Sequence, residues 1–415
     1  MIIDRPLTEA EKRRSRLCYT ISNGFGAMGG CMVFGVLLLA GVELEVDNKI
    51  LSTFGSINYA SYAAIPLGIL VTRRLGAGAS MLWGKVLITI MCVAIAACGL
   101  FPRFQGQLVF LAAMGVSYLA NSASIALLWP VQRCITDHDN LPGFLSLNNV
   151  VIAVANVTSS LLIAWFLKKH MGFGAFSTLF LVGGFFYVLN GVFFGLMAEP
   201  SELRQLAARP ILPQVQSAWK APGMGKLLAA NFICNFTIGI VLNVVTLAAK
   251  RGFNADNSCA MLLTLSQTLM VIIASCFFPQ VVRILGFRGS LLGSIIPMAV
   301  FCLCWLAIPV NTGFLGLLLP FILVGAIASF WAFALNLYFI GTVSPDDQLG
   351  GVMLIFIGTG MIPGLATIAI NPMIFALLER FHATSSADLY RRFFLLGLLL
   401  CPLMWWIFRR LPRRV

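Results

Sequence analysis

The sequence predicts an all-α membrane protein with 12 transmembrane helices in two pseudo-symmetric six-helix bundles, and three observations support this fold class. Hydrophobic residues make up 59% of the 415 residues and charged residues only 10%, whereas a typical soluble domain is about half apolar and a quarter charged. Long uncharged runs recur along the chain, and one long polar segment falls near its middle. The composition excludes a soluble enzyme, a disordered protein and a nucleic-acid binder.

Twelve runs, uncharged except for one lysine, are long enough to cross a bilayer as helices. Crossing takes about 20 residues, and a helix satisfies its own backbone polar groups inside lipid. The expected spans cover residues 17–40, 52–72, 81–101, 107–129, 143–167, 174–197, 227–249, 259–282, 289–309, 314–340, 350–378 and 393–408. Lys85 is the charged residue inside these limits, near the start of the third span. We expect its ammonium to reach the membrane interface.

Polar segments beside and between the spans predict the domain boundaries. We expect a cytoplasmic N-terminal segment at 1–16, six-helix bundles at 17–197 and 227–408, a cytoplasmic linker at 198–226 and a basic tail at 409–415. The first run is full membrane length, so it is expected to be a retained helix rather than a signal peptide. Twelve crossings put both termini on one side, which then carries 19 of the 28 Lys and Arg residues. The positive-inside rule therefore predicts cytoplasmic termini in a multi-pass protein of the cell (inner) membrane.

A repeated pattern indicates that the two halves are related by duplication. Positions 71–82 agree at six of twelve residues with the positions 210 residues later, and the matches include Gly76 and Gly286. A second echo, at the corresponding later loops, pairs Asp139 with Asp347. We expect both carboxylates to cap the helices that follow them, and a gating contact is the alternative. Two echoes in corresponding loops favour an internal repeat.

These features resemble the major facilitator superfamily of secondary transporters, whose loop after the second helix reads roughly GxLaDRxGRkxxL. The chain keeps Arg74 and Gly76 of this loop but has Arg73 in the position of the Asp. The resemblance extends over the whole chain through the helix count, the central linker and the paired loops. It implies a gating set in the two loops, namely Arg73, Arg74, Gly76, Arg283, Gly286 and Arg288. The latch that the Asp supplies in that family is not expected here.

The resemblance also implies that spans one, four, seven and ten line a central cavity. Polar and aromatic residues in these spans, joined by residues of spans two, five and eight, form the predicted binding set: Asn23, Tyr62, Ser117, Asn121, Asn149, Asn231, Asn235, Gln267, Trp331 and Asn336. An amide inside lipid needs a hydrogen-bond partner, so contact between helices is the alternative for each Asn and Ser. For Tyr62 and Trp331 the alternative is packing or interfacial anchoring.

Ionisable residues are nearly absent from the expected spans, and this limits the chemistry available there. No His, Asp or Glu lies within them, so an embedded enzyme acting on lipid-linked substrates lacks an acid/base pair. A strongly anionic or cationic solute likewise lacks an obvious partner. Glu43, at the outer end of span one, is the proton-coupling candidate if that span extends further; the alternative is a solvated loop acid. No CxxC pair occurs, so neither a metal site nor a cofactor is expected.

The sequence therefore predicts a secondary transporter that moves a small neutral or zwitterionic organic solute by alternating access. Facilitated diffusion and proton coupling both stay open. The expected partners are the solute, membrane lipids and, in the coupled case, protons; no nucleic acid is expected, and the chain should act as a monomer. The main alternative is a non-transporting receptor or assembly factor on the same scaffold, followed by the membrane-embedded enzyme.

Overall fold

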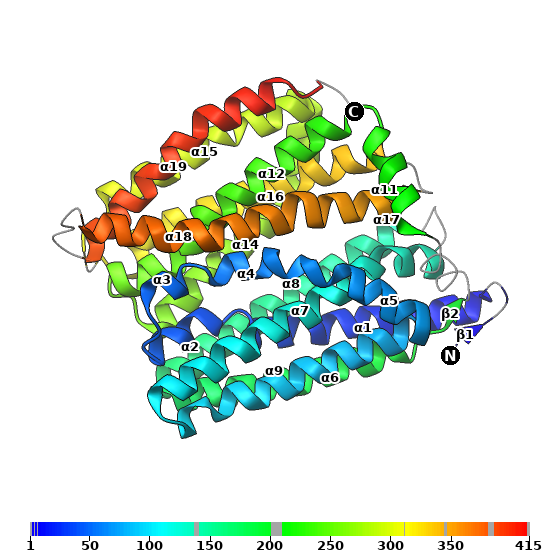
Figure 1. Cartoon of the computed structure of the whole chain (residues 1–415), viewed down its shortest axis with the longest axis horizontal. Helices are drawn as coiled ribbons and strands as arrows, with labels where there is room; N and C mark the ends of the chain where they lie inside the picture. Colours follow the sequence, from blue (N-terminus) through cyan, green and yellow to red (C-terminus); the bar gives the residue numbers. More distant parts are fainter. Residues whose placement is uncertain are drawn as a thin grey trace. The chain divides into compact units, whose positions relative to one another are not determined.

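The chain folds into long helices of membrane-crossing length (Figure 1). The computed structural model describes residues 2–3, 5, 7–136, 141–200, 210–310, 312–343, 347–380 and 386–412. Within these ranges eleven helical stretches are long and apolar enough to span a bilayer. A further helix of 33 residues, α7 (Arg103–Ile135), takes the place of the expected fourth span. The expected all-α membrane fold is confirmed.

Contacts between residues divide the chain into two compact units. Unit 1 consists of Met1–Val46 and Ser61–Pro210, and unit 2 consists of Asp47–Ala60 and Ile211–Val415. The segment Asp47–Ala60 belongs to the first half of the sequence but groups with unit 2.

Unit 1 is a bundle of long helices with one short parallel strand pair. Its elements are β1 (Ile2–Ile3), α1 (Glu9–Val33), α2 (Leu37–Glu43), η1 (Ser61–Ala64), α5 (Ile65–Leu75), α6 (Ala77–Ala96), η2 (Ala97–Leu100), α7, α8 (Leu141–Lys169), α9 (Phe173–Gly195) and β2 (Glu199–Pro200). The strand pair joins the two ends of the unit, with Ile2 opposite Glu199. Helix α9 packs along both α1 and α6.

Small residues explain why α6 and α9 lie side by side (Figure 1). A Cβ placed on Gly191 of α9 would lie 3.1 Å from Leu82 Cδ1 of α6 and 3.2 Å from Lys85 Cβ. Glycine therefore lets the two helix backbones approach closely, as is common between helices in lipid.

The first helix starts earlier than the expected limit of residue 17. Thr8 and Glu11 form a capping box, in which the Thr8 N–H donates to Glu11 Oε2 at 2.9 Å and the Glu11 N–H donates to Thr8 Oγ1 at 3.4 Å. This pair satisfies two N–H groups that a helix start leaves open. The helix ends at Val33, and the chain continues after a turn as α2.

Unit 2 contains the remaining helices, including two π-helical segments. Its elements are α3 (Asn48–Leu51), α4 (Phe54–Ala60), α11 (Ile211–Lys220), α12 (Met224–Ile240), η3 (Leu242–Val244), α13 (Val245–Leu247), η4 (Ala248–Gly252), α14 (Asn257–Gly293), α15 (Ile295–Ala307), α16 (Gly313–Thr342), α17 (Gln348–Met353), η6 (Leu354–Met361), α18 (Ile362–Arg380) and α19 (Ser386–Arg409). The short helices α3 and α4 pack against α18, and α15 packs against α19.

The expected linker contains a helix, and this changes the role of one predicted cap. Helix α11 lies within residues 198–226 and packs against α17. Asp347 precedes α17, but its carboxylate makes no cap hydrogen bond there; it accepts a bond of 2.7 Å from Ser217 Oγ of α11. The capping prediction for Asp347 is therefore wrong, because a neighbouring helix supplies a hydroxyl. Asp139 lies outside the described residues.

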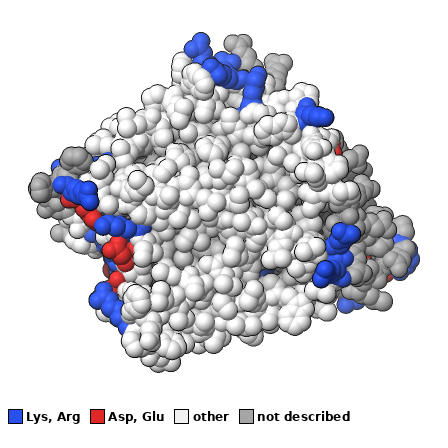
Figure 2. Space-filling view, in the orientation of Figure 1, with Lys and Arg blue, Asp and Glu red and all other residues white. Residues whose placement is uncertain are grey.

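Charged side chains are rare along the middle of the long helices. Figure 2 shows Lys, Arg, Asp and Glu gathered at the margins of the visible face, with a broad uncharged surface between them. Exposed residues on the helices are large and apolar, for example Trp83, Leu161, Phe185 and Leu399. Such a surface is suited to contact with lipid chains rather than water.

Candidate functional site

Lys85 lies inside unit 1, not at its edge. Helix α6 begins at Ala77, so Lys85 lies about 12 Å along its axis. Its side chain is 5% exposed, and Nζ donates a hydrogen bond of 2.9 Å to Asn121 Oδ1 of α7. The ammonium also lies 4.9 Å from the ring centre of Tyr187 on α9. The expectation that Lys85 reaches the membrane interface is wrong, because the helix starts earlier than the apolar run suggested.

The other predicted binding residues on α7 and η1 are only partly available to a solute. Ser117 is fully buried and donates to the Ala113 carbonyl of its own helix at 2.8 Å. Tyr62 is half-buried in η1. Its neighbour Ser61 forms a hydrogen bond of 2.6 Å with Ser122, which joins η1 to α7.

The predicted binding residues of α1 and α8 differ in their surroundings. Asn23 of α1 is half-buried, and its Nδ2 donates to Asn148 Oδ1 of α8 at 3.3 Å. Asn149, the next residue on α8, is exposed and lies on another side of that helix. The hydrogen bond between Asn23 and Asn148 therefore connects two helices, as the alternative interpretation expected.

In unit 2 the structure brings two predicted amides together on one partner. Asn231 Nδ2 donates to Thr359 Oγ1 at 2.5 Å, and Asn235 Nδ2 donates to the Thr359 carbonyl at 2.7 Å. Thr359 lies in the π-helical segment η6, and its hydroxyl donates to the Ile355 carbonyl. The orientation of both amides follows, because each faces a group that accepts. π-Helical turns inside helices are frequent at functional sites.

The remaining predicted binding residues of unit 2 do not join this pair through hydrogen bonds. Trp331 of α16 is buried, and its Nε1 donates to Ser294 Oγ at 2.8 Å. Gln267 is half-buried on α14, and a Cβ on Gly325 of α16 would lie only 2.3 Å from the Gln267 carbonyl oxygen. Asn336 lies in α16, but its side chain is outside the described part of the chain.

The two glycines of the gating set share an unusual backbone conformation. Gly76 has φ 89° and ψ 165°, and Gly286 has φ 71° and ψ 171°. Positive φ suits glycine because it has no Cβ. Gly76 separates α5 from α6, and Gly286 interrupts α14 between two expected spans. Similar conformations at the matched positions agree with the internal repeat.

The arginines of the gating set lie at helix ends. Arg73 and Arg74 are exposed in the last turn of α5. Arg283 is exposed and Arg288 is half-buried, on either side of the break at Gly286.

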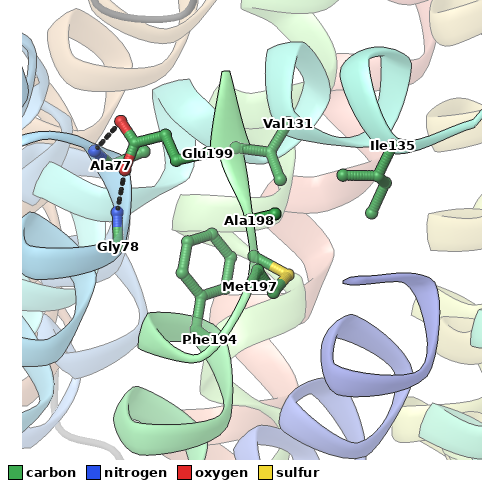
Figure 3. Close-up of a pocket in the computed structure, with 8 residues that line it drawn as sticks. All are labelled: Ala77, Gly78, Val131, Ile135, Phe194, Met197, Ala198 and Glu199. Atoms are coloured by element: carbon green, nitrogen blue, oxygen red, sulfur yellow. Dashed lines mark hydrogen bonds between the residues drawn. The ribbon is translucent and has the colours of Figure 1, made fainter. Parts of the chain in front are cut away.

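Glu199 is a residue that the sequence analysis did not single out. It is 8% exposed, and its carboxylate accepts hydrogen bonds from the N–H groups of Ala77 at 2.6 Å and Gly78 at 3.0 Å (Figure 3). A negative charge at a helix start satisfies open N–H groups and is favoured by the helix dipole. In the sequence Glu199 is visible only as an acid just after the sixth apolar run. Its partner Ala77 lies 122 residues earlier, so the sequence does not reveal the contact.

A small hollow adjoins this cap (Figure 3). Apart from the Glu199 carboxylate its walls are apolar side chains and backbone of α6, α7, α9 and the segment between α9 and β2: Ala77, Gly78, Val131, Ile135, Phe194, Met197 and Ala198. The mouth is open to solvent, so the pocket is a surface hollow next to a helix start rather than an enclosed binding cavity.

Acidic residues of the expected outer side lie in or beside short helices. Glu43 is the last residue of α2 and is half-buried. Glu379 of α18 pairs with Lys49 of α3 at 2.9 Å, within unit 2. The hydrogen bond and negative charge of Glu379 raise the pKa of Lys49 above its ordinary value. Within the described ranges, no group of three His, Cys, Asp or Glu side chains could hold a metal ion.

Comparisons with known proteins agree on the fold. No protein-family model matches the chain, and no curated protein matches it in sequence. Solved structures of transporters match it along almost its whole length. A D-xylose-proton symporter has a TM-score of 0.72 at 14% identity, with 97% of this chain and 98% of the symporter covered.

Two further structures belong to transporters of other solutes. The nucleoside transporter NupG, in a single-residue mutant form, has a TM-score of 0.68 at 12% identity, covering 96% of this chain and 99% of NupG. An auto-inhibited POT family peptide transporter has a TM-score of 0.67 at 14% identity, covering 95% and 97%. The chain therefore has the major facilitator fold of secondary transporters, which the sequence resemblance implied.

Proposed function

We propose that the protein is a secondary transporter that moves a small neutral or zwitterionic organic solute across a membrane by alternating access. The observation that carries the proposal is the match of the whole chain to the fold of xylose, nucleoside and peptide transporters. The division of the chain into two compact helical units is compatible with such a cycle. A protein of this fold supports transport rather than an enzymatic reaction.

The predicted binding set supports a solute recognised by hydrogen bonds. On α7, Asn121 is half-buried, and its amide oxygen is held by Lys85. On α12, the Nδ2 groups of Asn231 and Asn235 are engaged by Thr359. We assign solute contact to the other end of each amide. Asn121 would donate through Nδ2, and Asn231 and Asn235 would accept through Oδ1. Tyr62, Asn149, Gln267 and Asn336 stay in the binding set as predictions.

We assign opening and closing to the gating set, with Glu199 as an additional stabilising residue of the loop that contains Gly76. Glu43 is the proposed proton-coupling residue, since it ends a helix and is half-buried. The excess of basic residues on the side of the termini supports cytoplasmic termini in a cell (inner) membrane. A monomer in contact with lipids is sufficient for this function.

Uptake into proteoliposomes tests the proposal. The purified protein is first screened by thermal shift with D-xylose, uridine, amino acids and dipeptides, and each stabilising solute is then supplied radiolabelled with and without a pH gradient. We expect at least one solute to accumulate inside the vesicles. The variant Asn231→Leu should lower this uptake because it removes an amide of the predicted binding set. A solute that binds but never crosses would instead indicate the receptor alternative.

A further inference from the structure

The ammonium of Lys85 is buried inside unit 1. The side chain leaves α6, passes Gly191 of α9 and ends between α7 and α9. The two groups that contact it, the Asn121 amide and the Tyr187 ring, are both uncharged. A charge inside a membrane bundle is costly unless an opposite charge or several hydrogen bonds compensate it.

Within the part of the chain that the structure describes, no carboxylate lies within ion-pair distance of Lys85. The described ion pairs of unit 1 lie elsewhere, as for Arg5 with Glu11 and Arg103 with Glu45. An ammonium carries three N–H donors, and one of them is engaged by Asn121. The site therefore has a positive charge and an incomplete set of acceptors.

The hydrogen bond also fixes the orientation of the Asn121 amide. A lysine ammonium donates and cannot accept, so the atom that faces it is the amide oxygen. The Nδ2 group of Asn121 then points away from Lys85. Because the nearby positive charge draws electron density from the amide oxygen, the Nδ2 hydrogens become stronger donors. Asn121 is half-buried, in contrast to Lys85.

We propose that Lys85 and Asn121 form a recognition point for a carboxylate group of the transported solute. Asn121 Nδ2 donates to a carboxylate oxygen, and Lys85 is a positioning residue that orients the amide and compensates the negative charge. This inference rests on the proposed function and narrows the solute to a molecule that bears a carboxylate, zwitterions included. Lys85 and Asn121 would supply the partner that an anionic group otherwise lacks among the expected spans.

Matched pairs of probes test the proposal on the full-length protein. L-alanine, L-alanyl-L-alanine and D-gluconate are each compared with the corresponding amide, alongside D-xylose and uridine, by thermal shift and then by uptake into proteoliposomes. The wild type should prefer at least one carboxylate over its amide. Lys85→Met should lower that preference roughly tenfold or more, because the Asn121 amide loses the group that orients it and the carboxylate loses the positive charge that compensates it.

Two variants separate recognition from folding. Lys85→Arg keeps a charged donor and should keep most of the preference, whereas Lys226→Met makes the same loss of charge at an exposed residue of α12 and should change nothing. If Lys85→Met does not fold, Asn121→Ala must lose the preference instead, since it removes the donor itself.

The outcomes distinguish this inference from the proposed function. Uptake of D-xylose or uridine, with no carboxylate probe bound or taken up, overturns the inference and leaves the transport function standing. A carboxylate preference that is unchanged in Lys85→Met and in Asn121→Ala overturns the assigned residues. If no probe stabilises the protein or enters the vesicles, both the inference and the proposed solute class fail.

Discussion

At the scale of single residues, Glu199 caps the start of α6, which the sequence of the loop between α5 and α6 does not reveal. The loop that follows α5 has Arg73 where the family pattern has an acid. The start of α6 is nevertheless held by a carboxylate, because Glu199 follows α9 and accepts from the N–H groups of Ala77 and Gly78. The acid thus comes from another part of unit 1, and it fixes one helix start rather than joining two bundles.

Removal of this cap should destabilise the protein. Glu199→Ala leaves two N–H groups at the start of α6 without their acceptor, so we expect the free energy of unfolding to fall by about 1–2 kcal/mol. Thermal or denaturant unfolding in detergent measures this change. Glu9→Ala is the control, since Glu9 is exposed and pairs with Lys12 on the surface. Equal stability of the two variants would contradict the capping role.

Lys85 shows why burial is hard to predict from an apolar run. The run that follows residue 80 suggested a helix start four residues before Lys85, but α6 begins at Ala77. A shift of four residues is about 6 Å along a helix, enough to move an ammonium from the interface to the interior. The partner Asn121 was recognised as a polar residue of span four, but not its contact with Lys85.

At the scale of elements, the contact between α12 and η6 should depend on the hydroxyl of Thr359. Thr359→Val keeps the shape of the side chain but leaves the buried Asn231 amide without its acceptor. We expect a loss of about 1–3 kcal/mol in the free energy of unfolding. Thr178→Val in α9 is the control, because Thr178 is exposed and bonds only within its own helix. If Thr178→Val lowered the free energy of unfolding and Thr359→Val did not, the role of the Thr359 hydroxyl would be contradicted.

The break inside α14 should require glycine at position 286. Alanine at this positive φ is strained, so Gly286→Ala should lower the free energy of unfolding by about 1–2 kcal/mol. Gly293→Ala lies on the same helix, where a Cβ meets no atom within 4 Å, and it should be neutral or slightly stabilising. Unfolding of both variants under identical conditions gives the comparison, and no loss in Gly286→Ala would exclude the strained turn.

At the scale of the whole molecule, the fold could be predicted from the sequence because its signals are local. Uncharged runs of membrane length predicted the helices, and the matched loops predicted that Gly76 and Gly286 are equivalent, as their backbone angles bear out. Contacts between distant segments could not be predicted in this way. The bond between Glu199 and Ala77 and the bond between Ser217 and Asp347 join residues more than 100 positions apart.

The grouping of Asp47–Ala60 with unit 2 also depends on distant contacts. Ser52 accepts through its carbonyl from Asn371 Nδ2 at 3.1 Å, and Ser56 Oγ donates to the Gly239 carbonyl at 3.3 Å. Each side chain was visible as a polar residue in an apolar run, but its partner depends on the packing of helices far apart in sequence. The hydrogen bonds of the candidate site also join helices that are far apart in sequence. Its polar residues could therefore be predicted, but the partners of those residues could not.

Counterflow in proteoliposomes tests the central claim of alternating access most directly. Vesicles are preloaded with a high concentration of an unlabelled solute that stabilises the protein, and the same solute is added outside at trace concentration with a radiolabel. A carrier that alternates between two sides should accumulate label transiently above its equilibrium level, because unlabelled solute returns the binding site outward. Entry of label without this overshoot, or binding without any entry, would contradict the account.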